Sequence, residues 1–313
     1  MSRPSLVKSL LLLVFFLPVY ASALTISPTK IEVAIDPGQT AIGEIEVFNE
    51  QDETKTFYTT FENFEPRGET GSPYFTGSGS GLASWIAATE RFEIKPGERI
   101  AIAYSISVPE ETTAGGYFAG IFFGTQPPTS EGGGEVSIGG KVGSLVLLRV
   151  NGDIAESGGI LDFTTLDKNR FFSTLPISFT YRFNNTGADR VVPKGEIVIK
   201  NSIAQKSANV SANATEGSIL PSSIRKFEVA WNEAESLSPE ANFFATALYQ
   251  LKNFHLGLYK ANIELVWGES AQRGTASTWF FLFPWQLLTL VAAAGVLFRS
   301  YHSFVVRRAK STK

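Results

Sequence analysis

The sequence predicts an all-β chain of two tandem β-sandwiches followed by one C-terminal transmembrane helix. Short runs with apolar side chains at every second position follow one another from residue 24, separated by turns rich in Pro, Gly, Asn and Asp. Between the two ends of the chain, no long segment has the 3.6-residue period of an amphipathic helix. The C-terminal end is an uncharged run followed by a basic tail, a pattern typical of a membrane anchor.

The first 23 residues have the three parts of a secretory signal peptide. Arg3 and Lys8 form the positive n-region, Leu10–Tyr20 is the apolar region, and residues 21–23 match an A-x-A cleavage site. Cleavage there makes Leu24 the mature N-terminus. An uncleaved anchor is the alternative, and either interpretation predicts that the chain is exported.

The first domain is expected over residues 24–153. Two Pro-Gly turns, at Pro37-Gly38 and Pro96-Gly97, join pairs of alternating strands. The expected strands cover residues 26–35, 41–48, 56–64, 91–94, 100–108, 117–123 and 142–150, with a long polar loop at 65–81. The Pro- and Gly-rich segment 125–140 is interpreted as the tip of a hairpin between the last two strands. The alternative is that this segment is an interdomain linker.

The second domain is expected over residues 160–267. Its clearest strand, Leu175–Phe183, places four apolar side chains on one face. Further strands are expected at 160–163, 195–199, 224–231 and 256–266, while 243–251 is compatible with either a strand or a helix. Both domains are expected to be immunoglobulin-like β-sandwiches that lack the cysteine pair of antibody domains.

A helix over residues 279–298 is long enough to cross a membrane. This run of 20 residues (279–298) has no charge and, at about 1.5 Å per residue, matches the roughly 30 Å of a bilayer core. The tail, residues 299–313, has five Lys and Arg and no acid, which predicts a cytoplasmic tail and external sandwiches in the cell membrane. Trp279 and Trp285 at interfacial positions disfavour a buried core helix. Residues 268–277 are then a short polar spacer.

Charge and cysteine content exclude several kinds of partner and site. All 30 acidic residues and 20 of the 27 Lys and Arg lie in residues 24–276, so this part has a net charge of 20 − 30 = −10. Such an acidic surface argues against nucleic acid as a partner. The chain has no cysteine, which excludes disulfides, thiolate metal sites and cysteine nucleophiles.

The residues that carry catalysis in other proteins are scarce here. Only two histidines occur, His255 and His302, and neither belongs to a recognisable triad, phosphate loop or metal motif. The acidic pairs at 52–53 and 110–111 are interpreted as solvated turn residues rather than a calcium or glycosidase site. We therefore predict no catalytic residue, no cofactor and no metal, and a protein that is not an enzyme.

Tyr74 and Phe75 are the candidate binding residues. They lie within a Gly- and Pro-rich loop, where conspicuous aromatic side chains can form a contact surface. The alternative is that both side chains fold back onto the first sandwich.

The order of these segments resembles the WxL-interacting cell-surface proteins of bacteria. The stretches that carry the resemblance are IEVAIDPGQTAIGEIEVFNE, FEIKPGERIAIAYSISVPEETTAGGYFAGIFF and ISFTYRFNNTGADRVVPKGEIVIKN. In the first two, Pro-Gly turns precede a strand that ends in Asn, and a strand that ends in Val-Pro precedes a Gly-rich turn. The resemblance implies a first domain associated with peptidoglycan and a second associated with partner or host proteins. It carries over no binding residue.

The function expected from these features is that of a membrane-anchored cell-surface binding or scaffold protein. Its sandwiches would contact a cell-wall polymer or a partner surface protein. The main alternative is an assembly factor resembling pilus chaperones, which would donate strand Val142–Val150, or an edge strand, to its clients. A third hypothesis is an anchored hydrolase that depends on His255.

Overall fold

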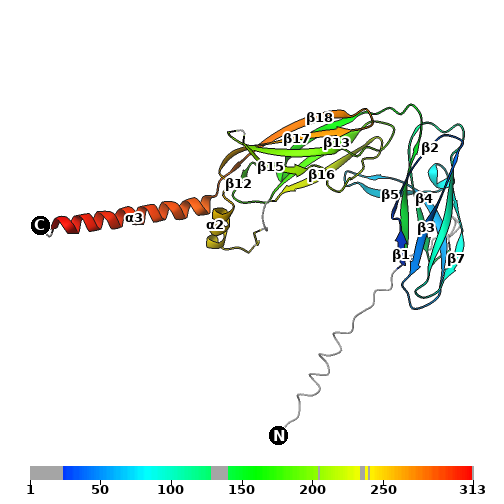
Figure 1. Ribbon diagram of the computed structural model, residues 1–313, viewed down its shortest axis with the longest axis horizontal. Helices are drawn as coiled ribbons and strands as arrows, with labels where there is room; N and C mark the ends of the chain where they lie inside the picture. The colour runs from blue at the N-terminus through cyan, green and yellow to red at the C-terminus, as the bar shows by residue number, and fades with distance from the viewer. Residues whose placement is uncertain (1–23, 128–139, 204, 233–236, 239, 312–313) are drawn as a thin grey trace, which may run out of the picture. The chain divides into compact units, whose positions relative to one another are not determined.

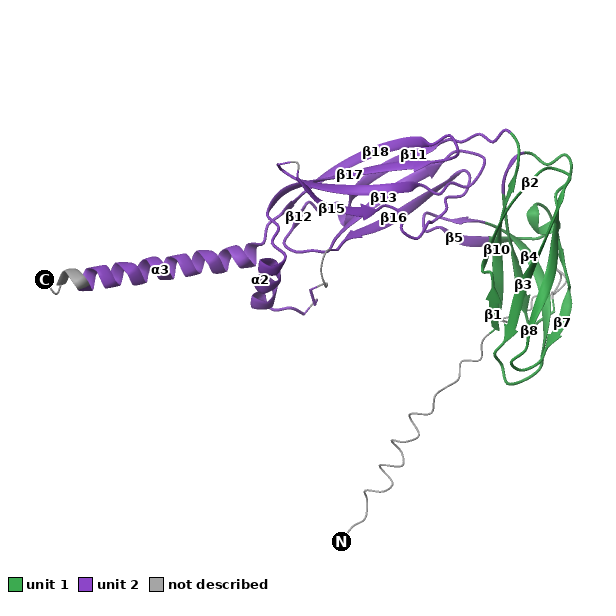
Figure 2. Ribbon diagram, viewed as in Figure 1, with its two compact units in different colours: residues 1–64, 75–113, 117–152 green, residues 65–74, 114–116, 153–313 purple. Residues whose placement is uncertain are grey.

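The computed structural model describes residues 24–127, 140–203, 205–232, 237–238 and 240–311. The predicted signal peptide, most of segment 125–140 and the last two tail residues lie outside this range. The chain forms two compact units: unit 1 comprises residues 1–64, 75–113 and 117–152, and unit 2 comprises 65–74, 114–116 and 153–313 (Figure 2). Most of the described chain is β-strand, and the predicted all-β class with immunoglobulin-like sandwiches and an apolar C-terminal helix is confirmed.

Unit 1 is built around two sheets whose inner faces share one core. One sheet has the order β1 (Leu24–Ser27), β3 (Thr40–Asn49), β8 (Arg99–Ser107), β6 (Ile86–Ala88). The other has the order β2 (Lys30–Ile35), β10 (Lys141–Val150), β9 (Gly115–Gly124), β4 (Lys55–Arg67), β5 (Ser72–Gly77), with β7 (Arg91–Ile94) also paired to β4. Segment 125–140 therefore connects two adjacent strands of one sheet.

The first strand of unit 1 is divided between the two sheets. β1 pairs antiparallel with β3, whereas β2 pairs in parallel with β10. Pro28 lies between them and has no N–H to continue the first ladder, so the chain changes partner there.

The core of unit 1 lies between its two sheets and contains Ile45, Ile121 and Val146, none of which is exposed. Each such side chain stabilises the fold by about 1.5–3 kcal/mol.

Unit 2 repeats the two-sheet arrangement and adds two helices, α2 (Phe243–Lys252) and α3 (Trp285–Ser311) (Figure 1). Its smaller sheet has the order β11 (Gly158–Thr165), β13 (Ile177–Asn185), β16 (Ser223–Trp231). Its larger sheet has the order β12 (Phe171–Phe172), β18 (Gln272–Leu282), β17 (Gly257–Trp267), β14 (Lys194–Asn201), β15 (Lys206–Ser211).

Aromatic side chains fill much of the core of unit 2. Tyr181 stacks on Phe227 with ring centroids 4.7 Å apart, and its hydroxyl donates to the Ala212 carbonyl oxygen at 3.1 Å. Burial raises the pKa of the Tyr181 hydroxyl well above its usual value, so the side chain remains neutral. The sequence leaves segment 243–251 open between a strand and a helix, and in the structure it forms the helix α2.

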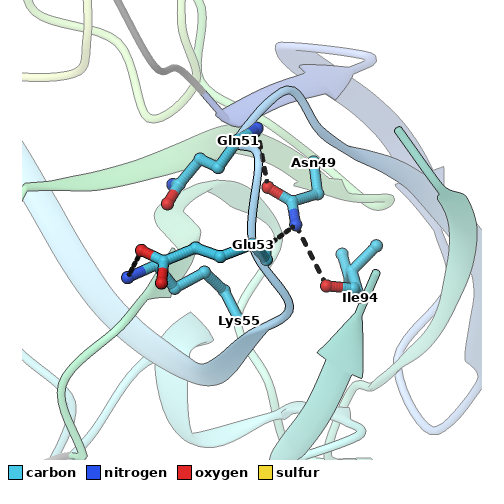
Figure 3. Close-up of polar contacts among 5 residues, drawn as sticks. All are labelled: Asn49, Gln51, Glu53, Lys55 and Ile94. Atoms are coloured by element: carbon cyan, nitrogen blue, oxygen red, sulfur yellow. Dashed lines mark hydrogen bonds and ion pairs between the residues drawn. The ribbon is translucent and has the colours of Figure 1, made fainter. Parts of the chain in front are cut away.

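A buried asparagine ends a strand in each unit. The Asn49 side-chain amide donates to the carbonyl oxygens of Glu53 and Ile94, both at 3.0 Å, and its oxygen accepts from the Gln51 backbone N–H (Figure 3). Asn185 makes the same three kinds of bond in unit 2, to Asp189, Ile219 and Gly187. Both side chains are fully buried. We call these two side chains the asparagine clamps.

Removing the clamp of unit 1 should be costly. Asn49→Ala leaves buried carbonyl groups without a donor, and we expect unit 1 to lose about 2–3 kcal/mol of unfolding free energy in denaturant titrations. The control is Asn151→Ala, since Asn151 makes an exposed bond to Asp36 and should lose no more than about 0.5 kcal/mol. Equal losses in the two variants would contradict the structural role of Asn49.

Candidate functional site

The chain passes from the last strand of unit 2 directly into α3. Only Phe283 and Pro284 separate Leu282, which ends β18, from Trp285, which begins the helix. The Phe283 N–H donates to the Phe172 carbonyl oxygen at 2.8 Å, so even this connection is tied to the sheet. The expected spacer at 268–277 is instead a turn followed by the first part of β18.

The predicted transmembrane segment 279–298 is therefore wrong at its start. Residues 279–282 pair with β17, and Phe280 and Leu282 are buried in the core of unit 2 while Trp279 points outward. A short apolar run fits a buried strand as well as a helix, and its hydropathy cannot distinguish the two. The helix begins at Trp285, six residues (285 − 279) later.

α3 has the length and composition of a membrane span. Of the helices in the described part of the chain, it alone passes this test, over the 24 residues Trp285–Arg308, whose most apolar 18-residue stretch has a mean hydropathy of 1.3. Leu287, in its first turn, is buried against the rest of unit 2, whereas every residue from Val291 to Arg308 is exposed. Apolar surface left in water costs roughly 25 cal/mol per Å². The helix can therefore serve as a membrane anchor.

The uncharged part of α3 is shorter than a bilayer. It runs from Trp285 to Phe298, 14 residues (285–298), and ends at Arg299. At about 1.5 Å per residue it covers roughly 21 Å of the roughly 30 Å hydrocarbon core. The next apolar residues, 304–306, lie beyond Arg299 and directly before Arg307.

α2 lies beside the start of α3 and is held there by polar contacts (Figure 1). The Gln250 amide donates to the Ser173 carbonyl oxygen at 3.1 Å and to Gln286 Oε1 at 2.6 Å. Its oxygen accepts from the Leu287 backbone N–H at 2.9 Å. Asn242 caps the helix by accepting from the Ala245 N–H at 2.9 Å. A buried glutamine thus joins α2 to both the sandwich and α3.

Exposed apolar side chains surround the junction between the sandwich and α3. They come from β12, α2, the loop after it, β17, β18, the connection at 283–284 and the first turn of α3. We call this set the apolar collar: Phe171, Phe243, Phe244, Leu248, Leu251, Phe254, Leu256, Leu258, Trp279, Phe283 and Trp285. Phe243 contacts Trp285 with ring centroids 5.7 Å apart, which links α2 to α3 through the collar.

Two shallow depressions adjoin the collar. One, of about 480 Å³, lies between β12 and the first turn of α3 and is lined by aromatic residues that include Phe171, Phe283 and Trp285. The other, of about 570 Å³, lies over β14, β17 and β18, and Lys200, Lys260 and Trp279 line it.

The sequence-predicted binding residues Tyr74 and Phe75 lie in strand β5 rather than in a loop. Tyr74 is 52% exposed, with the Arg67 guanidinium 5.5 Å from its ring centroid. Phe75 folds onto the sheet of unit 1 and packs edge-to-face on Phe122, with ring centroids 4.9 Å apart. The sheet therefore separates the two side chains, and only Tyr74 offers much free surface.

The other candidates of the sequence do not converge on a site. His255 packs on Trp231, with ring centroids 5.2 Å apart, and its Nδ1 lies 3.3 Å from the Tyr259 hydroxyl. Within the described ranges, no three His, Asp or Glu side chains are grouped so as to hold a metal ion. β10, the strand proposed for donation to a client, lies between β2 and β9, and its Val146 and Leu148 are buried.

Comparison with known proteins gives similarity at the level of solved structures only. No family model and no curated protein matches the chain. The class 5 fimbriae chaperone CfaA aligns at 13% identity and a TM-score of 0.40, over 83% of this chain and 100% of its own. The Csu pilus complex CsuC–CsuE of Acinetobacter baumannii aligns at 11% identity and 0.37, over 82% and 98%. The E. coli chaperone DraB aligns at 10% and 0.34, over 84% and 98%. Similarity at this level supports no inference about what this chain binds.

Weakening the Gln250 contacts should free α2 from α3. In Gln250→Ala, three hydrogen bonds worth about 0.5–1.5 kcal/mol each are lost. We expect faster amide hydrogen exchange throughout α2, with unchanged exchange in β13 and β17. Lys252→Ala, at the exposed end of the same helix, serves as the control and should exchange like the unmodified protein. Unchanged protection of α2 in Gln250→Ala would show that these bonds do not position the helix.

Proposed function

We propose that the chain is a single-pass surface protein whose α3 crosses the cell membrane and whose two β-sandwiches bind a partner outside it. The observation that carries this proposal is α3, an apolar helix that continues directly from a folded sandwich and is exposed from Val291 to Arg308. From Val291 onward, no protein surface within the described chain covers the helix. A bilayer can cover its apolar side chains, while the helix satisfies its own backbone groups internally.

The charge distribution supports this orientation. Arg299, Arg307 and Arg308 follow the uncharged part of α3, with Lys310 and Lys313 beyond them, and no acid accompanies them. Positive residues next to a span favour the cytoplasmic side. The N-terminal signal-peptide pattern independently favours export of everything that precedes α3.

A binding role is favoured over catalysis because the described residues offer aromatic surface and no convergent catalytic groups. The outer face of the larger sheet of unit 1 has four aromatic rings outside the core. We call it the aromatic surface: Phe75 and Phe118, which are half-buried, and Phe64 and Phe122, which are buried beside them. Lys141 lies 4.6 Å from the centroid of Phe122. Aromatic residues are enriched in protein interfaces, and flat rings also pack on sugar rings.

The partner proposed is a surface protein or a cell-wall polymer, in agreement with the resemblance to WxL-interacting proteins. An assembly-factor role would need an edge strand other than β10, since that strand is paired on both sides. The aromatic surface does not depend on a free strand edge, which is why we favour binding through side chains.

The binding role can be tested with the full-length chain reconstituted in lipid nanodiscs. Phe118→Ala removes a half-buried ring of the aromatic surface and should weaken capture of isolated cell-wall polymer or of envelope proteins by about tenfold or more. Ile42→Ala, at an exposed apolar position on the other sheet of unit 1, should bind like the unmodified chain. If neither preparation binds the unmodified chain, the binding role is wrong. If both variants bind equally, the surface assignment is wrong.

A further inference from the structure

The polarity of α2 is the reverse of that of a helix packed on a soluble domain. Its inward side contains Thr246, Ala247 and Gln250, all buried. Its outward side presents Phe244, Leu248 and Leu251, which are 69%, 54% and 60% exposed. These three positions are spaced four and three residues apart and therefore form one stripe along the helix. The apolar stripe faces away from the sandwich, toward whatever surrounds the molecule there.

The position of α2 in unit 2 identifies that environment. Gln250 binds Gln286 and the Leu287 N–H at the first turn of α3, and Phe243 contacts Trp285. The apolar stripe is thus continuous, through Trp285, with the exposed apolar surface of the helix that we propose to span the membrane. Several kinds of molecule could cover this stripe. Lipid is the one that must already be present beside the first turn of α3 if α3 spans the membrane.

The length of α3 supports the same conclusion. Its uncharged part covers roughly 21 Å, about 9 Å less than a typical hydrocarbon core. A short span is accommodated by thinning of the bilayer or by burial of flanking residues in its interface. The collar places apolar side chains from α2 and Phe283 at the end of α3 where additional apolar length is needed.

We propose that α2 lies in the outer lipid–water interface as an in-plane helix, with Phe244, Leu248 and Leu251 among the lipid chains. This inference rests on the proposed membrane anchoring. An amphipathic helix of this kind buries its apolar face roughly 5–10 Å into the boundary between head groups and acyl chains. Unit 2 is then attached to the membrane at two points, by α3 and by α2, so its smaller and larger sheets keep a fixed orientation on the membrane.

The charges around the collar are complementary to lipid head groups. Residues 241–263 contain Lys252 and Lys260 and no acid, although the part of the chain outside the membrane has a net charge of −10. The Arg170 guanidinium lies 4.3 Å from the ring centroid of Trp279, at the edge of the collar. Basic groups beside an apolar stripe favour the phosphates of a membrane surface. The proposal therefore predicts stronger insertion of α2 in vesicles that contain anionic lipid.

The absence of cysteine allows a direct test. The full-length chain is prepared as Leu248→Cys, Val291→Cys and Thr275→Cys, each labelled with the environment-sensitive fluorophore NBD and reconstituted at one chain per lipid nanodisc. Val291 lies in α3, and Thr275 is exposed in β18 seven residues (282 − 275) before its end. A spin-labelled lipid quenches fluorophores in the bilayer, and iodide quenches those in water.

The proposal predicts that the labels at 248 and 291 are blue-shifted and quenched by spin-labelled lipid, whereas the label at 275 is quenched by iodide. If the label at 248 responds to iodide while that at 291 responds to lipid, α3 spans the membrane and the interfacial role of α2 is wrong. A label at 248 that neither reagent reaches means that protein covers the stripe, which also overturns the proposal. If the label at 291 responds to iodide, the anchoring function itself fails.

Discussion

The register of β18 determines where α3, the proposed membrane anchor, begins. Leu282 pairs with Gly257 of β17, and two residues later the chain is already helical. Two residues reach at most about 7 Å, so the second sandwich has no flexible spacer that could separate it from the start of α3. The collar, the two depressions and α2 all lie at this end of unit 2. Their proposed role as membrane-facing surfaces follows from that single connection.

The sandwiches reach their stability without disulfides. Each unit has its own core, and each ends a strand with a fully buried asparagine whose amide bonds to two carbonyl groups of neighbouring turns. Such bonds satisfy backbone groups that would otherwise be buried without a partner. The clamps therefore secure the turns that a disulfide often secures in exported domains, and they do so independently of the redox state of the compartment.

The sequence predicts the strands well where alternation is strict, as in β13, and it predicts the two-sandwich class. It fails at residues 279–298, which are apolar throughout although they belong to two elements. The first part of this run lies in β18 and most of the rest in α3, and hydropathy does not mark the boundary between them. The loop expected at 65–81 contains β5, since sheet pairing outweighs its high content of Gly and Ser. The collar could not be predicted, because it combines residues from seven segments that only the fold brings together. One signal was present: residues 241–263 lack acids in an otherwise acidic part of the chain.

We propose that α3 crosses the membrane with both sandwiches outside. Protease added to sealed right-side-out vesicles that contain the full-length chain tests it most directly, with mass spectrometry of what survives. We expect the strands of both units to be degraded and a fragment beginning close to Trp285 and including Arg307 and Arg308 to be protected. A protected fragment that contains the sandwiches, or loss of the arginine-rich tail while the sandwiches survive, would contradict it.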